Sequence, residues 1–239
     1  MRGFLNKSST VKTMKHNAIL AILVLMLISA KAVGQNIQLH YDFTRKCATS
    51  TIEMFRPDKV GSTFFFVDMD FNPRVKSVYG EIAREFCFWQ DSKLNWLSLH
   101  IEYNGGMDGG FSFNNNWLGG FTYSGHSDDW SKTWSFSAMY KAIPGNTHVH
   151  NFQLTGVWNL DFFDHWLSFD GVADFWREVT GVTKYSFATE PQLWVNLNKV
   201  KGMEDVDLSI GTEIELSVNF AGAKGFNAMP TVGVKYTFK

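Results

Sequence analysis

The chain of 239 residues contains little cysteine and little proline. Two cysteines and five prolines are too few for a disulfide-built scaffold or a proline-rich segment. The motifs G-x-S-x-G, C-x-x-C and H-E-x-x-H, which mark common nucleophile, redox and zinc sites, are also missing. We therefore expect no catalytic residue, no metal ligand and no cofactor.

Long apolar runs are absent apart from one near the start of the chain. Residues 18–28 are apolar, but a membrane-spanning helix needs about 20 such residues. A positively charged stretch precedes this run and small residues follow it, which is the order of a secretory signal peptide. We expect residues 1–34 to be a signal cleaved after Gly34, with cleavage after Ala32 as the alternative. Residues 35–239 then form one mature domain.

Basic residues are scarce once the expected signal is removed. Five of the 22 bases lie in residues 1–34, which contain no acid, so the mature chain carries 17 bases against 23 acids. Nucleic acids and anionic membrane surfaces attract basic patches, so this net charge of −6 disfavours both. Nucleic acid is not an expected partner.

Aromatic residues are abundant, at 16% of the chain, and apolar and polar residues alternate over most of its length. Alternation with period two indicates strands with one apolar and one polar face. Twelve such stretches occur at residues 37–44, 49–55, 63–71, 78–89, 97–104, 117–123, 133–140, 151–160, 167–176, 185–197, 207–220 and 231–238. This pattern predicts an all-β fold, a single-domain transmembrane antiparallel β-barrel of about 12 strands with both termini periplasmic. A soluble β-sandwich is the alternative.

The last predicted strand has a pattern beyond simple alternation. Thr231, Gly233, Tyr236 and Phe238 resemble the C-terminal strand by which outer-membrane barrels of Gram-negative bacteria are recognised for insertion. The resemblance implies that residues 231–238 bind the barrel-insertion machinery. We therefore expect a monomer in the outer membrane of a Gram-negative bacterium, in contact with its lipid.

The polar faces of these strands predict an acidic lumen lined with aromatic rings. The candidate substrate-binding residues are Asp42, Glu53, Phe64, Phe66, Asp68, Glu81, Arg84, Glu85, Glu102, Asp174, Trp176, Glu190, Trp194, Glu213, Glu215 and Lys235. Carboxylates accept hydrogen bonds from sugar hydroxyls and base amino groups, and aromatic rings stack on flat solutes. Such a lumen disfavours anions. For any single carboxylate, pairing that only maintains the shape of the barrel is the more frequent role.

The fourth predicted strand contains an arginine at an outward position and one of the two cysteines. Simple alternation would place Arg84 against lipid, at a cost of about 2 to 4 kcal/mol. A β-bulge near Ala83 would turn Arg84 inward to pair with a carboxylate, and we expect that bulge. Cys87 should lie near the periplasmic end of this strand and Cys47 in the first outer loop, too far apart for a disulfide.

Five segments carry a resemblance to a known family. They are STFFFVDMD (62–70), EIARE (81–85), EYNGG (102–106), ADFWRE (173–178) and EPQLW (190–194). With the strands in place, the chain resembles a family of outer-membrane proteins known as a domain of unknown function, which is similar to the Tsx-like nucleoside-specific channel-forming porins. The resemblance covers nearly all of the mature chain. It implies a twelve-stranded barrel with a narrow lumen and passive uptake of nucleosides.

The expected function is a channel through which small polar solutes diffuse, nucleosides first among them. A plugged structural or adhesin-like barrel without transport is the second interpretation. An outer-membrane barrel enzyme is the third, although no serine and histidine stand in an arrangement that argues for it.

Overall fold

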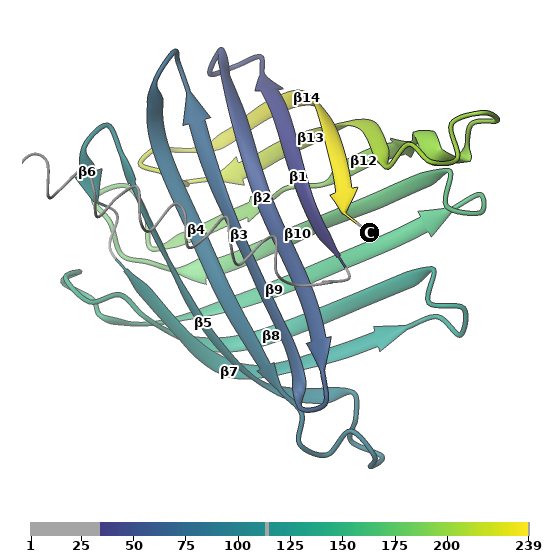
Figure 1. Ribbon diagram of the computed structural model, residues 1–239. Helices are drawn as coiled ribbons and strands as arrows, with labels where there is room; N and C mark the ends of the chain where they lie inside the picture. Colours follow the sequence, from purple (N-terminus) through teal and green to yellow (C-terminus); the bar gives the residue numbers. More distant parts are fainter. Residues whose placement is uncertain (1–33, 113–114, 239) are drawn as a thin grey trace, which may run out of the picture. The chain divides into compact units, whose positions relative to one another are not determined.

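The structure, a computed structural model, describes residues 34–112 and 115–238 (Figure 1). The expected signal segment, residues 1–34, lies outside these ranges apart from Gly34. In the described ranges, no helix combines the length and the apolar character needed to cross a membrane.

Almost all regular structure in these ranges belongs to one antiparallel sheet. Its strands are β1 (Gln35–Asp42), β2 (Cys47–Asp58), β3 (Gly61–Phe71), β4 (Val75–Phe86), β5 (Leu97–Asp108), β6 (Phe111–Ser112), β7 (Asn116–His126), β8 (Lys132–Ala142), β9 (His150–Phe162), β10 (Leu167–Arg177), β11 (Tyr185–Thr189), β12 (Gln192–Asn196), β13 (Leu208–Val218) and β14 (Phe226–Phe238). A short 3-10 helix, η1 (Leu197–Lys199), follows β12.

The wall of the barrel has twelve strands, as predicted. The two-residue β6 pairs only with β5 and adds nothing to the circuit. β11 and β12 form one continuous wall strand, because both pair with β10 in a single register, Ala173↔Thr189 and Asp170↔Gln192. The interruption falls at Pro191, which has no backbone N–H to donate to the ladder.

The sheet closes on itself at the two ends of the chain. β14 pairs with β1 from Gln35↔Phe238 to Asp42↔Thr231, and β9 pairs with β10 on the other side of the circuit. No strand edge is left open in the described wall, as a barrel in lipid requires. Figure 1 shows β14 ending beside the start of β1. We call this end of the barrel the terminal end and the opposite one the far end.

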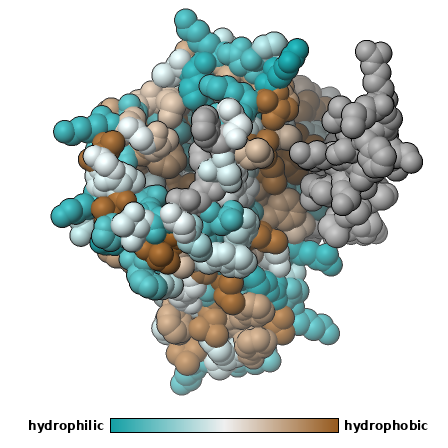
Figure 2. All heavy atoms as spheres, turned by 90° about the vertical axis from the view of Figure 1, so that its left-hand side faces the viewer, coloured by the Kyte–Doolittle hydropathy of each residue, from teal (hydrophilic) through white to brown (hydrophobic). Residues whose placement is uncertain are grey.

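The barrel is apolar outside and polar inside. Along β1, Gln38 and His40 are 1% and 3% exposed, whereas Leu39 between them is 51% exposed. Polar side chains outnumber apolar ones among the buried residues, the reverse of a water-soluble core. On the face shown in Figure 2, hydrophobic side chains gather in the lower part of the view. The fold is therefore a membrane-spanning barrel and not a soluble sandwich.

Several predicted boundaries differ from the structure. Gly105 and Gly106, expected in a loop, belong to β5, and a side chain at Gly106 would lie 2.2 Å from the carbonyl oxygen of Val78 on β4. Phe220 ends the predicted strand 207–220, and alternation places it on the outer face; in the structure it lies after β13 and lines the interior cavity. Asn219 adopts a φ of 55° there, which ends the alternation of the strand.

Candidate functional site

A cavity of about 2090 Å³ occupies the interior of the barrel. Residues from both ends line it, including Asn36 and Trp130 at the terminal end and Asn116 and Gly222 at the far end. Fourteen acidic residues and three basic ones are among its lining residues. The cavity is therefore continuous along the barrel and strongly negative in formal charge.

All but two of the predicted site residues line this cavity. Those that do are Asp42, Glu53, Phe64, Phe66, Asp68, Glu81, Glu85, Glu102, Asp174, Trp176, Glu190, Glu213, Glu215 and Lys235. The two that do not are Arg84 and Trp194. Period-two alternation was sufficient to place the others because all but Glu190 lie inside a regular strand, and the alternation continues across the gap that contains Glu190.

The predicted bulge near Ala83 is wrong, and Arg84 lies on the outer face. β3 and β4 pair without a shift from Gly61↔Phe86 to Asp70↔Ser77, and the irregularity comes only after Asp70. Arg84 donates hydrogen bonds of 2.7 and 3.0 Å to the two carboxylate oxygens of Asp58. β4 ends at Phe86, so Arg84 lies near the end of its strand, where an outward arginine costs less than at mid-membrane.

Trp194 belongs to the wall and offers no ring face to the lumen. Its side chain is completely buried, and its Nε1 donates to the side-chain oxygen of Gln192 at 2.9 Å. His40 contacts the ring edge-to-face with the centroids 5.5 Å apart, and Lys235 Nζ lies 4.6 Å from the ring centroid. Trp194 therefore positions Lys235.

One group of the predicted carboxylates is held by a buried histidine. His100 Nδ1 lies 2.5 Å from Glu85, and its Nε2 lies 3.1 Å from Glu102. Thr122 donates to Glu85 and Asn104 donates to Glu102. Glu85 and Glu102 are therefore already engaged in hydrogen bonds with residues of the wall.

A second group surrounds Arg45, which was not among the predicted site residues. Arg45 Nε donates to Asp42 at 2.6 Å, and its Nη1 donates to Asp70 at 3.1 Å. Burial by itself lowers the pKa of Arg45, but the hydrogen bond to Asp42 and the charge of Asp70 raise it above its ordinary value. The sequence did contain a signal for this ion pair, because Asp42 and Arg45 are three residues apart across a tight turn.

The two lysines of the lumen are also engaged. Lys141 Nζ donates to Gln153 at 2.8 Å and lies 4.9 Å from the ring centroid of Trp176. Lys235 Nζ donates to Asp170 at 3.0 Å. The ring of Phe220 meets that of Trp176 edge-to-face at 5.5 Å. Trp176 therefore lines the cavity with one face already covered by a cation.

Most of the other inward carboxylates accept hydrogen bonds from neighbouring wall side chains. Asn36 donates to Glu53 at 3.0 Å, and Thr51 donates to Asp68 at 2.6 Å. Thr155 donates to Asp174 at 2.5 Å. Such cross-strand pairs hold the shape of the barrel, which is the structural role expected for most single carboxylates.

Glu81 and Glu190 differ from these carboxylates. Within the described part of the chain, neither side chain has a hydrogen bond, and both line the cavity. Glu81 lies midway along β4, and Glu190 lies between β11 and β12, on the opposite side of the twelve-strand circuit. These two carboxylates are available to a solute.

An aromatic strip lies beside Glu81. The ring centroids of Phe64 and Phe66 are 6.0 Å apart, and those of Phe66 and Tyr79 are 5.8 Å apart. Phe66 is the register partner of Glu81, so the strip and this carboxylate share one section of the lumen. Tyr79 was not among the predicted site residues, although it has the same parity as Glu81 on the same strand.

Groups that could hold a metal ion are absent from the described ranges, by the criterion of three or more clustered histidine, cysteine or acidic side chains. Both cysteines are unpaired and lie at opposite ends of the barrel, Cys47 at the start of β2 and Cys87 just after β4. The expectation that they do not form a disulfide is confirmed.

The fold and the cavity define a porin-like β-barrel. The chain belongs to the family described as a domain of unknown function (DUF5020), whose model matches residues 34–238. Its structure is similar to the KdgM porin, with a TM-score of 0.50, 12% identity, and 87% of this chain and 100% of that chain covered. It is also similar to the NanC porin, with a TM-score of 0.56, 6% identity and coverages of 86% and 100%. No curated protein sequence matches the chain.

Proposed function

We propose that the protein is an outer-membrane channel through which small polar solutes diffuse passively, with nucleosides as the first substrates. The observation that carries this proposal is the single cavity lined by residues from both ends of the barrel. A plugged structural barrel would close its interior with side chains at some level. The porin fold supports the same function at the level of architecture.

The charge of the lumen determines which solutes are favoured. Acidic residues outnumber basic ones along the cavity, so anions are repelled and cations or neutral polar molecules are admitted. Because the other carboxylates and the lysines are largely engaged with wall residues, Glu81 and Glu190 dominate this selection.

The aromatic strip supports a flat solute such as a nucleoside. A base can stack on Phe66 and Tyr79 while its amino group donates to Glu81. Phosphorylated nucleotides are disfavoured by the same carboxylate. The substrate-binding role therefore falls on a subset of the predicted lumen residues.

The placement of the barrel in the cell is part of the proposal. The apolar outer surface contacts outer-membrane lipid, both termini face the periplasm, and the barrel works as a monomer. Insertion proceeds through recognition of residues 231–238, which form the end of β14 and complete the seam with β1.

Swelling of proteoliposomes tests the function directly. Adenosine, adenosine monophosphate and a sugar of similar size are compared, with protein-free liposomes as the control. We expect swelling with adenosine to exceed that with the other two solutes. Equal rates for all three would remove the nucleoside preference, and no swelling with any would favour a plugged barrel.

A further inference from the structure

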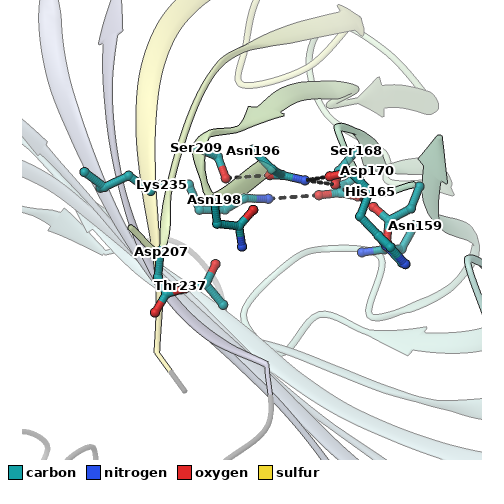
Figure 3. Close-up of a pocket in the computed structure, with 12 residues that line it drawn as sticks. Asn159, His165, Ser168, Asp170, Asn196, Asn198, Asp207, Ser209, Lys235 and Thr237 are labelled. Atoms are coloured by element: carbon teal, nitrogen blue, oxygen red, sulfur yellow. Dashed lines mark hydrogen bonds and ion pairs between the residues drawn. The ribbon is translucent and has the colours of Figure 1, made fainter. Parts of the chain in front are cut away.

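A second, smaller cavity adjoins the main one at the terminal end of the barrel (Figure 3). Its volume is about 290 Å³, and nearly all of its lining residues are polar. They come from the ends of β9, β12 and β14, the starts of β10 and β13, the η1 segment, and the connections just before β10 and β13. Asp170 and Lys235 line both cavities, so the small pocket opens onto the main pathway.

The walls of this pocket are held by a network centred on Asn196. Ser209 donates to Asn196 at 2.6 Å, and the Asn196 amide donates to the carbonyl oxygen of His165 at 2.7 Å and to Ser168 at 3.0 Å. Ser168 in turn donates to Asp161 at 2.5 Å. Because each of these side chains already has partners on adjacent segments, they define the shape of the pocket rather than its ligand contacts.

Two side-chain oxygens of the pocket lack a hydrogen-bond donor among the described residues, unlike those of the Asn196 network. Within the described residues, Asp170 Oδ1 and Asn198 Oδ1 are buried and accept no hydrogen bond. Lys235 occupies only the other oxygen of Asp170. Burying an acceptor without a donor is costly, so both atoms call for a molecule that brings hydrogen-bond donors into the pocket.

The geometry points to a site for the vicinal diol of a small sugar ring, such as the ribose of a nucleoside, with Asp170 and Asn198 accepting from its hydroxyls. This inference rests on the proposed nucleoside function and names the part of the solute held at this end. Two neighbouring hydroxyls supply two donors on one face of a ring, which matches two unpartnered acceptors in one pocket.

The size and charge of the pocket restrict the class of ligand further. A volume of 290 Å³ is at the small end for ligand sites, so it holds one sugar ring and leaves an attached base in the main cavity. Asp161, Asp170 and Asp207 line the pocket against the single lysine Lys235. A phosphorylated sugar is therefore excluded by charge.

Isothermal titration of the detergent-purified barrel tests the site with adenosine, 2′,3′-dideoxyadenosine and free ribose. We expect adenosine to bind roughly 10-fold or more tightly than the dideoxy compound, because two hydrogen bonds are lost together. Equal affinities for the two nucleosides would overturn the diol site. Absence of binding by both adenosine and ribose would overturn it as well.

Variants of Asn198 separate recognition from a change in pocket shape. Asn198→Ala removes one acceptor and should weaken adenosine binding by roughly 3- to 10-fold without changing the affinity for the dideoxy compound. Asn198→Asp retains an acceptor oxygen and should bind adenosine about as well as the wild type. Asn146→Ala, in the loop between β8 and β9 at the far end, is the matched control. An equal loss for both nucleosides in Asn198→Ala would contradict the inference.

Failure of this site and failure of the channel can be told apart. If proteoliposomes swell with adenosine but the two nucleosides bind equally, the channel function is supported and the diol site is contradicted. If adenosine binds with the expected preference but no solute causes swelling, the diol site is supported and the channel function is contradicted.

Discussion

Arg84 donates to both carboxylate oxygens of Asp58 at the terminal end of the barrel, at 2.7 and 3.0 Å. The two residues come from different strands, β4 and β2, and Thr63 on the intervening β3 adds a third hydrogen bond at 3.0 Å. An arginine side chain can face outward here because the pair neutralises it near the end of its strand.

Removal of Asp58 should therefore destabilise the barrel. In Asp58→Asn, Arg84 keeps its charge and loses its counter-ion, so we expect the folded barrel to convert to the unfolded form at a lower temperature. Heat-modified mobility in SDS gels measures that temperature. The double variant Asp58→Asn/Arg84→Gln should recover part of the loss, and an unchanged transition in Asp58→Asn would show that the pair has no stabilising role.

Neutralising the two unpartnered carboxylates should change ion selectivity. A unit charge about 10 Å from a passing ion contributes roughly 0.4 to 1.7 kcal/mol at effective dielectric constants from 80 to 20. Because the charge attracts a cation and repels an anion by the same energy, each of Glu81→Gln and Glu190→Gln should lower the cation-to-anion permeability ratio by roughly 4-fold or more, as measured by reversal potentials in planar bilayers. Glu204→Gln, in the segment between η1 and β13, is the control. A ratio that stays at the wild-type value in both lumen variants would refute the assignment.

The aromatic strip should contribute to the binding affinity of flat solutes only. Phe66→Leu removes the ring beside Glu81, and stacking of a base on an aromatic side chain contributes about 1 to 3 kcal/mol. We expect adenosine to bind at least about 5-fold more weakly, with ribose unaffected, by titration calorimetry. Phe65→Leu alters the adjacent residue on the outer face and should leave both affinities unchanged. Equal losses for ribose and adenosine would exclude stacking.

The turn between β7 and β8 provides a pH prediction outside the membrane-spanning strands. Hydrogen bonds from Ser127 and then Ser131 lower the pKa of Asp129 from 3.8 to about 2. Because the folded-state pKa is depressed, the stabilisation is complete above pH 3.8 and is lost as the pH falls through about 2. A carbon NMR titration of Asp129 should show a midpoint near 2, and Ser127→Ala should raise it. A midpoint near 3.8 in the wild type would contradict the contacts.

The wall of the barrel could be predicted from the sequence because alternation is a local property. Inward Glu81 and outward Ile82 follow from the geometry of one strand, whatever lies beside it. The strand around Pro191 was also predicted as one unit, since apolar and polar residues keep their alternation across the proline. The DUF5020 family match confirms the resemblance found in the sequence, and the relation to Tsx-like nucleoside porins stays a prediction.

The errors arose where one residue depends on another strand. The bulge at Ala83 was inferred from the cost of an outward arginine in mid-strand, but β4 ends at Phe86 and Asp58 supplies the counter-ion from β2. Phe220 was placed outward by extending alternation past Asn219, where the backbone enters the left-handed region. Arg45 was missed because it lies in a turn, where the alternation pattern does not predict the direction of a side chain.

The sequence by itself determined the class of protein, the twelve-strand wall and most of the side chains that face its interior, because these follow from period-two alternation and composition. Only the tertiary structure decided which inward carboxylates are engaged. Asp42 and Asp70 share Arg45 and Glu85 shares His100 with Glu102, whereas Glu81 and Glu190 have no such donor. The physical reason is that hydrogen-bond partners are set by the stagger between strands far apart in the chain.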